Sequence, residues 1–467
     1  MMTTYVSKYN FEKEVTREFR FGDVKLVDTT LRDGEQTAGV VFDESDKLQI
    51  ARMLAEIGVE QIEAGIPVLS EGEKKTIKKI VSEKLGPSIM CWSPASKEKL
   101  DDVLYTGCDA VAISLATSDI HLEHKLKKTR DEAIAMIVPA IEYAKDHGLY
   151  VSFNAEDGTR TDYDFLLRYI KECTAAGGDR LRLCDTVAAM NPPAAKYLVS
   201  KLIKDTGVSI EFHAHNDYGL AVANSIAACT AGAEYVSTTV NGLGERAGNA
   251  SLEQMIMSLK MLYDKDKKYQ IKNLVKLSKF VEEASRVQVS QTQPIIGKNM
   301  FRHESGIHAH GVIAFPYTYE TFDPLLIGHK RELVIGRMSG KHAIEAKLKE
   351  YGIDATESAI KRILSDVKAI SEQRKSAFTD DEFISLARSV IGKEEAYVMV
   401  CLDPKSREEA YHEISKITQE AYRVSGDIDL IIKTTNDRLD QLLEKLSNVN
   451  GVRKTETHLV IQTLKAK

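Results

Sequence analysis

The sequence predicts an α/β protein, in which a (β/α)8 TIM barrel is followed by a small lid and helical region and by a C-terminal ferredoxin-like βαββαβ domain. Three observations lead to this prediction. Eight short apolar runs alternate with amphipathic helical stretches between residues 24 and 241. Polar residues gather where these runs end. A strand–helix–strand–strand–helix–strand order then fills residues 396–467.

The predicted barrel strands are the eight apolar runs, at residues 24–30, 61–66, 88–92, 110–116, 150–154, 180–185, 209–213 and 235–241. The stretches between them carry apolar residues at helical spacing, and a glycine such as Gly58 often follows as a C-cap. We therefore expect four parts: an N-terminal extension (1–23), the barrel (24–290), a linker with helical subdomains and a lid (291–392), and the ferredoxin-like domain (393–467).

Composition excludes several classes of protein. The formal net charge of −6, from 63 basic and 69 acidic residues, lacks the basic excess of nucleic-acid-binding proteins. No apolar run reaches the roughly 18 residues of a membrane span, and the N-terminus has no apolar signal core. The six cysteines are scattered without CxxC spacing, which argues against a disulfide frame or a zinc knuckle. These features predict a cytoplasmic enzyme that binds neither nucleic acid nor membrane.

The ends of two predicted strands supply a ligand set for a divalent metal. Asp33 follows the first strand, and His213 and His215 stand two residues apart, so that both imidazoles point to the same face of a strand. Asn249, in a later loop, is a fourth candidate ligand. This set of nitrogen and oxygen ligands suits Zn, Mn, Co or Mg and leaves positions open for substrate oxygens. The alternative is a hydrogen-bonded pair of histidines at a strand end.

Two charged residues near the same strand ends are candidates for chemistry. The planar fork of Arg32 suits the carboxylate of a 2-oxo acid whose ketone the metal polarises. The alternative for Arg32 is an ion pair with Glu35 or Glu63. Glu156 follows a strand of otherwise uncharged residues and is a candidate base, with Asp157 as its partner or as a helix cap.

Two later segments add candidates. Residues 242–249 resemble a glycine-rich phosphate loop, in which Gly242, Gly244 and Arg246 are candidates for binding a phosphate-bearing ligand such as CoA. The spacing is not that of a dinucleotide-binding loop. Residues 303–310 hold three histidines, which could include a general acid or base brought in from above the barrel or from a partner chain, or could form a solvated loop.

Several motifs in this order resemble one family, the acyl-CoA-dependent 2-oxo acid synthases on a metal-binding TIM barrel. Its members include isopropylmalate, citramalate, homocitrate and Re-specific citrate synthases. The resemblance covers residues 24–340 and rests on DTTLRDGEQ (28–36), AED (155–157), DT (185–186), EFHAHND (211–217), NGLGERAGN (241–249) and HESGIHAHG (303–311).

The resemblance implies a metal-dependent Claisen condensation of acetyl-CoA with a 2-oxo acid, with release of CoA. It implies that Asp33, His213 and His215 bind the metal, with Asn249 as a fourth ligand, and that Glu156 lies by the acetyl methyl group. The implied substrate-binding residues are Arg32, Gln36, Thr186 and His121. His308, with Tyr319 nearby, is expected to come from the neighbouring subunit of a homodimer or higher homo-oligomer.

The sequence predicts the type of reaction, but it leaves several 2-oxo acids open as the acceptor. The sequence around residues 64–67, 90–92 and 118–121 looks most like that of homocitrate synthases of the nitrogen-fixation type, which take 2-oxoglutarate. Lysine-pathway homocitrate synthases have an Arg where Ser152 stands and a His where Trp92 stands, and both help to hold the distal carboxylate there, so this chain departs from that way of binding it. His121, Lys125 and Arg160 are candidates to hold it instead. Oxaloacetate, as in Re-specific citrate synthases, and the acceptors of isopropylmalate or citramalate synthases stay open.

The C-terminal residues 396–467 resemble the small ligand-binding βαββαβ domains of amino-acid-responsive regulators. This resemblance implies feedback control by an amino acid, and the alternative is a dimerisation domain without a ligand. Two other readings of the whole chain also stay open. An acyl-CoA lyase on the same barrel would carry a catalytic Cys in the glycine-rich loop, where none is found. A sensor that has lost activity would not need the Arg32, Asp33, His213 and His215 set.

Overall fold

The computed structural model describes residues 5–265, 269–391 and 395–459. Contacts divide the chain into two units. The barrel unit comprises Met1–Phe301 and Thr321–Arg331, and the second unit comprises Arg302–Glu320 and Glu332–Lys467. No helix among the described residues is long and apolar enough to cross a membrane.

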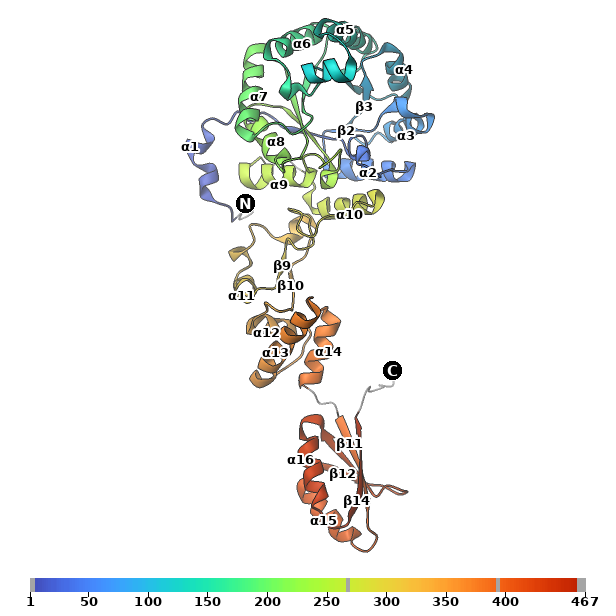
Figure 1. Ribbon diagram of the computed structural model, residues 1–467, viewed down its shortest axis with the longest axis vertical. Helices are drawn as coiled ribbons and strands as arrows, with labels where there is room; N and C mark the ends of the chain where they lie inside the picture. The colour runs from blue at the N-terminus through green and yellow to red at the C-terminus, as the bar shows by residue number, and fades with distance from the viewer. Residues whose placement is uncertain (1–4, 266–268, 392–394, 460–467) are drawn as a thin grey trace. The chain divides into compact units, whose positions relative to one another are not determined.

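Eight parallel strands close into a barrel in chain order, which confirms the predicted TIM barrel (Figure 1). The strands are β1 (Lys25–Asp28), β2 (Gln61–Glu63), β3 (Ser88–Pro94), β4 (Ala110–Ala116), β5 (Tyr150–Glu156), β6 (Arg180–Asp185), β7 (Ile210–Ala214) and β8 (Tyr235–Thr238). Only β4 and β6 have the predicted bounds, and the other strands differ from the prediction by one to three residues at one or both ends. β1 stops at Asp28 because Thr29 and Thr30 already turn into the loop, while β5 runs on to Glu156 because Ala116 of β4 still pairs with it.

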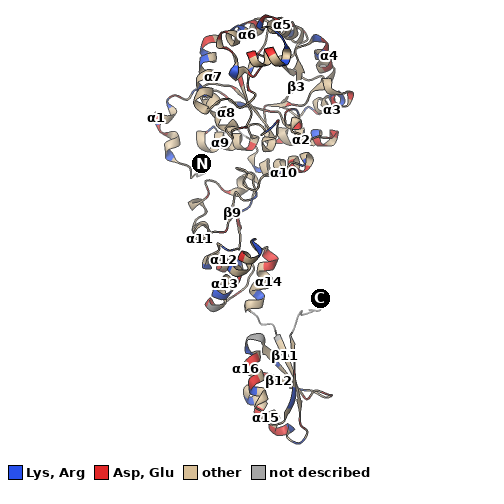
Figure 2. Cartoon of the chain, viewed as in Figure 1, with Lys and Arg blue, Asp and Glu red and all other residues tan. Residues whose placement is uncertain are grey.

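Helices pack around the barrel, each placed by a cap and an apolar face. In α2 (Glu44–Ile57), Asp43 and Asp46 form a capping box at the start, and Gly58 ends the helix with a φ of 94°. Acidic and basic residues are interspersed over these helices (Figure 2). The others are α3 (Glu71–Ser82), α4 (Lys97–Thr106), α5 (Arg130–Asp146), α6 (Tyr163–Ala175), α7 (Pro192–Thr206), α8 (Ala221–Thr230), α9 (Leu252–Tyr263) and α10 (Leu274–Ser285), after a short α1 (Lys13–Thr16).

The barrel interior holds a network of ion pairs, formed by Glu63, Arg180, Arg182 and Glu211, all with 0% exposure. Arg180 Nη2 and Arg182 Nε each lie 2.7 Å from an oxygen of Glu211, and Arg182 Nη1 lies 2.9 Å from Glu63 Oε2. Burial raises the pKa of Glu211, but Arg180 and Arg182 outweigh it and bring that pKa down to about 2. We call these four residues the buried ion-pair network.

The second unit contains a helical part with its own apolar core, which includes Ile344, Ile363 and Phe383. Its strands β9 (Arg302–His303) and β10 (Glu332–Leu333) pair in parallel. Its helices are α11 (Gly306–Ala314), α12 (Lys341–Glu350), α13 (Glu357–Arg374) and α14 (Asp380–Ile391).

The C-terminal domain is a four-stranded antiparallel sheet in the order β12-β13-β11-β14, which confirms the predicted βαββαβ domain. Val398, Val400 and Ile432 lie in its core. The predicted domain extended to residue 467, and residues 460–467 lie outside the described part of the chain. The elements are β11 (Glu395–Leu402), α15 (Arg407–Ile417), β12 (Glu420–Arg423), β13 (Leu430–Thr435), α16 (Asn436–Ser447) and β14 (Val452–Leu459).

Glu211→Gln should lower the free energy of unfolding of the barrel unit by about 3–5 kcal/mol at pH 7, because two buried guanidinium groups lose their carboxylate. Since the pKa of Glu211 lies at about 2 instead of 4.5, its contribution is present above pH 4.5 and is lost as the pH falls toward 2. The free energy of unfolding of the variant should therefore change less than that of wild type between pH 4.5 and pH 2.

Denaturant unfolding followed by the fluorescence of Trp92, the only tryptophan, measures this change in the barrel unit. Glu83→Gln, which removes a surface pair with Arg52, is the control and should cause no comparable loss. Equal free energies of unfolding of Glu211→Gln and wild type at pH 7 would contradict a stabilising role of Glu211 in the buried ion-pair network.

Candidate active site

A pocket of about 380 Å³ opens at the carboxyl ends of the barrel strands. This is the face where TIM-barrel enzymes carry their active sites. Side chains from the ends of β3 to β7 and from the loops after β1, β4, β6 and β8 line the pocket. They are Arg32, Asp33, Gln36, Trp92, Ser114, Lys125, Asn154, Glu156, Arg182, Cys184, Thr186, His213, His215, Glu245 and Arg246.

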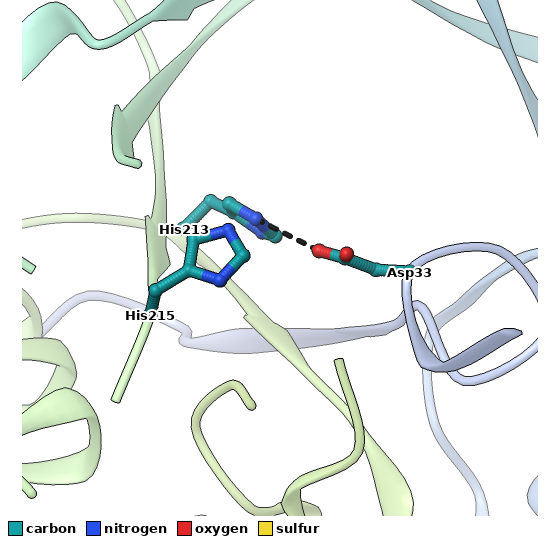
Figure 3. A group of neighbouring side chains, drawn as sticks. All are labelled: Asp33, His213 and His215. Atoms are coloured by element: carbon teal, nitrogen blue, oxygen red, sulfur yellow. Dashed lines mark ion pairs between the residues drawn. The ribbon is translucent and has the colours of Figure 1, made fainter. Parts of the chain in front are cut away.

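The three predicted metal ligands meet in this pocket (Figure 3). Ligand atoms of Asp33, His213 and His215 all lie within 4.8 Å of one another, and His213 Nε2 is 3.1 Å from Asp33 Oδ2. The two imidazole rings meet edge to face with centroids 5.1 Å apart. Their spacing of two residues at the end of β7 points both rings to the inside of the barrel.

Unpartnered polar atoms show that a divalent metal fits these residues. His213 Nδ1, His215 Nδ1 and Asn249 Oδ1 are buried and have no hydrogen-bond partner among the described residues. Asn249 pairs with His215 in an isolated bridge, and its Nδ2 donates to Leu243 O at 3.1 Å, which orients the amide. Buried polar atoms without partners are costly, and a cation bound by nitrogen and oxygen ligands would satisfy them.

The protonation states of the site also suit a metal. Burial raises the pKa of Asp33, but the charge of Arg32 and the hydrogen bond from His213 outweigh it, so the pKa is lowered and the carboxylate is ionised. Burial and the neighbouring His213 lower the pKa of His215 to about 4. At neutral pH His215 is therefore the neutral imidazole that binds metals.

Arg32 lies between the metal ligands and the buried ion-pair network. Its Nε and Nη2 lie 3.1 and 3.3 Å from the two oxygens of Glu63, and its Nη1 reaches Gln36 Oε1 at 3.3 Å. The predicted ion pair with Glu63 is thus present, while Glu35 pairs with Lys47 instead. Because Arg32 still lines the pocket, the ion pair positions its guanidinium and does not remove it from the site.

Glu156 is held by two side chains from a π-helix, His121–Leu126. Lys125 Nζ lies 2.5 Å and His121 Nδ1 3.4 Å from Glu156 Oε1. Arg160, the other candidate for the distal carboxylate, is bound to Asp157 at 2.8 Å and does not line the pocket. π-Helical turns are rare and often occur at functional sites.

The glycine-rich loop has a packing reason for its glycines. A Cβ on Gly244 would lie 2.3 Å from Asn249 Nδ2, and a Cβ on Gly248 would lie 1.9 Å from the carbonyl oxygen of Gly242. All three glycines have positive φ angles. The loop is therefore shaped to hold Asn249 beside His215, and CoA binding by Gly242, Gly244 and Arg246 stays a prediction.

Arg246 ties this loop to its neighbours, because it binds both oxygens of Asp217 at 2.8 and 3.0 Å and the carbonyl oxygen of Thr186 at 2.6 Å. His308 and Tyr319 belong to the second unit, where their rings lie 4.2 Å apart. Their catalytic roles also stay predictions.

Sequence reasoning missed Arg182, one of the two buried cations that line the pocket. A signal was available, because Arg180 and Arg182 stand two residues apart in an otherwise apolar strand and therefore face the same side. Ser114, Asn154, Cys184 and Glu245 were missed too, and they carry no distinctive pattern.

Comparison with known proteins agrees with this architecture part by part. The HMGL-like family model matches residues 23–281, the homocitrate synthase post-HMGL domain-like model matches 295–375, and the Lrp/AsnC ligand binding domain matches 395–467. Homocitrate synthase AksA of Methanothermobacter thermautotrophicus is 47% identical over 392 residues, which are 84% of this chain and 99% of that protein.

Two further similarities bear on the barrel. The 2-isopropylmalate synthase 2 of Caldanaerobacter subterraneus subsp. tengcongensis is 48% identical over 374 residues, 80% of this chain and 97% of that protein. The HMG-CoA lyase structure from Bacillus subtilis superposes with a TM-score of 0.53 at 21% identity, over 58% of this chain and 97% of that one. The last likeness shows a common fold only.

His213→Ala should lower the bound divalent metal at least about tenfold, since even residues that only support metal ligands cost that much when removed. Metal content after dialysis against a defined Mn²⁺ buffer, measured by mass spectrometry, checks this. His147→Ala is the matched control, because His147 is exposed and its ring hydrogen-bonds the carbonyl oxygen of Tyr143. A His213→Ala protein with one metal per chain would remove His213 from the ligand set.

Proposed function

This chain belongs to the HMGL-like family and is an acyltransferase, and we propose that it condenses acetyl-CoA with a 2-oxo dicarboxylic acid and releases CoA. Our preferred acceptor is 2-oxoglutarate, which gives homocitrate. The alternative within the same class is oxaloacetate, as in Re-type citrate synthases. Isopropylmalate or citramalate synthesis is less well supported by the pocket.

One observation carries the choice of acceptor, namely the polar and charged lining of the pocket. Arg32, Lys125, Arg182 and Arg246 line it together with the carboxylates of Asp33, Glu156 and Glu245, whereas among the lining residues only Trp92 and Cys184 have largely apolar side chains. A branched apolar acceptor would favour a wall of aliphatic side chains. A lining rich in guanidinium and ammonium groups favours an acceptor with two carboxylates.

The proposed roles follow from the geometry. Arg32 binds the carboxylate next to the ketone, and Gln36 and Thr186 are hydrogen-bonding partners of the acceptor. A divalent metal held by Asp33, His213 and His215, with Asn249 as a further ligand, would act as a Lewis acid toward the ketone oxygen.

The proton chemistry falls to Glu156. In the proposed step, a carboxylate oxygen of Glu156 takes a proton from the acetyl methyl group, while Lys125 and His121 hold the carboxylate in place. The resulting carbon nucleophile forms a C–C bond to the ketone carbon, whose π electrons move to its oxygen. The alkoxide then takes up a proton, which balances the one that Glu156 removed. Water then breaks the C–S bond of the thioester, and CoA leaves as a thiol. We retain His308 with Tyr319 as a further acid–base pair, supplied by a neighbouring copy in a homodimer.

For the C-terminal domain we propose a regulatory role, with an amino acid as effector. The match to the Lrp/AsnC ligand binding domain supports this role. The domain also has an apolar core of its own, separate from that of the barrel. A dimerisation domain without a ligand is the alternative.

Purified enzyme with added Mn²⁺ or Mg²⁺ should release CoA thiol from acetyl-CoA fastest with 2-oxoglutarate. A thiol-reactive dye measures the release, and oxaloacetate, 2-oxoisovalerate and pyruvate are the comparison acceptors. A preference for oxaloacetate would make the enzyme a Re-type citrate synthase. A preference for either monocarboxylic acid would contradict the proposed class, and no release with any acceptor would favour the lyase and sensor alternatives.

Removing residues 396–467 should leave kcat within about twofold, because the barrel and the C-terminal domain have separate cores. It should abolish inhibition by whichever standard amino acid inhibits the full chain. Thiol release by both proteins across a panel of amino acids checks this. An inactive but folded truncated protein would assign the domain a structural role.

A further inference from the structure

We propose that Arg182 binds the distal carboxylate of the acceptor, in a subsite on the pocket wall formed by Ser114 of β4, Asn154 of β5 and Arg182 of β6. This inference rests on the proposed function and names the residues that select a second carboxylate. Ser114 is in register with Asn154, and Asn154 with Arg182, so the three form one row across adjacent strands. All three line the pocket.

The depth of this row suits a dicarboxylic acid. Glu156 and His213 stand one inward-facing position nearer the carboxyl ends of β5 and β7, since Arg182 is in register with Glu211 and Cys184 with His213. One such step is roughly 6–7 Å along a strand. An acceptor with its ketone beside His213 would therefore place a carboxylate at the deeper row through a short methylene spacer, and the two methylenes of 2-oxoglutarate reach further than the one of oxaloacetate.

Arg182 has an N–H donor, on Nη2, that lacks a strong acceptor. Its Nη1 and Nε face Glu63 and Glu211, but its Nη2 donates to the thioether sulfur of Met90 at 3.4 Å, which is a weak acceptor. A carboxylate oxygen would be a much stronger partner. The neighbouring Asn154 Oδ1 is buried without a hydrogen-bond partner among the described residues, and rotation of this amide would present its NH₂ group to the same carboxylate.

The other cations of the pocket are less suitable. Lys125 is half exposed and pairs with Glu156, and Arg246 pairs with Asp217. Arg32 and Arg182 are thus the two buried guanidinium groups that face the pocket, which matches an acceptor with two carboxylates.

The test compares Arg182→Met with Arg180→Met. Arg180 is an equally buried member of the same network, but it does not line the pocket, so its variant is a matched control. For Arg182→Met we expect kcat/KM to fall about 100-fold with 2-oxoglutarate and to stay within about threefold with 2-oxobutyrate, which lacks the distal carboxylate. For Arg180→Met the ratio of kcat/KM with 2-oxoglutarate to kcat/KM with 2-oxobutyrate should equal that of wild type.

A second readout is binding itself. Trp92 is the only tryptophan and lines the pocket, so its fluorescence should respond to both acids in wild type and only to 2-oxobutyrate in Arg182→Met. If Arg182→Met does not fold, Arg182→Lys keeps the charge without the planar fork. It should raise KM for 2-oxoglutarate about tenfold, with KM for 2-oxobutyrate unchanged.

The outcomes separate the two proposals. If wild type releases no CoA with 2-oxoglutarate or oxaloacetate, the proposed function fails. If wild type uses a dicarboxylic acid, but the Arg182 variants lose both acceptors equally or neither, the distal-carboxylate subsite is wrong and the function stands.

Discussion

The active site depends on one constraint: an ionised carboxylate buried inside the barrel is costly unless a cation or hydrogen-bond donors compensate its charge, and Glu63 is compensated by cations. Glu63 satisfies it twice, because Arg32 lies 3.1 Å and Arg182 2.9 Å from its oxygens. The same carboxylate therefore sets the position of the guanidinium next to Asp33 and of the one deeper in the pocket. The predicted metal ligands and the proposed row of Ser114, Asn154 and Arg182 are therefore linked through Glu63.

The parts of the molecule that sequence reasoning predicted are those encoded by local patterns. Alternation of apolar runs and amphipathic helices predicted the closed barrel, and strand ends predicted that Asp33 would meet His213 and His215. Asn154 and Arg182 were missed as neighbours in the pocket because their placement depends on the register between β5 and β6. The ion pair between Glu35 and Lys47 was missed because Lys47 lies on α2 and meets Glu35 only in the folded barrel unit.

The glycine-rich loop illustrates how one pattern serves two explanations. Glycines before a helix predict a phosphate site, yet here Gly244 and Gly248 leave no room for a side chain against Asn249 and Gly242. This close packing is enough to explain the glycines without a ligand. The motif is thus informative about the placement of Asn249, whatever binds outside the loop.

The π-helix at His121–Leu126 has a consequence for how the site tolerates change in length. Its wide turn, closed by the amide of Lys127 and the carbonyl of Leu122, holds one residue more than an α-helical turn. Loss of any single residue there would let the turn tighten and rotate Lys125 by about 100° around the helix axis, away from Glu156. The segment can accept substitutions at its exposed positions, but its residue count is constrained by the carboxylate that it holds.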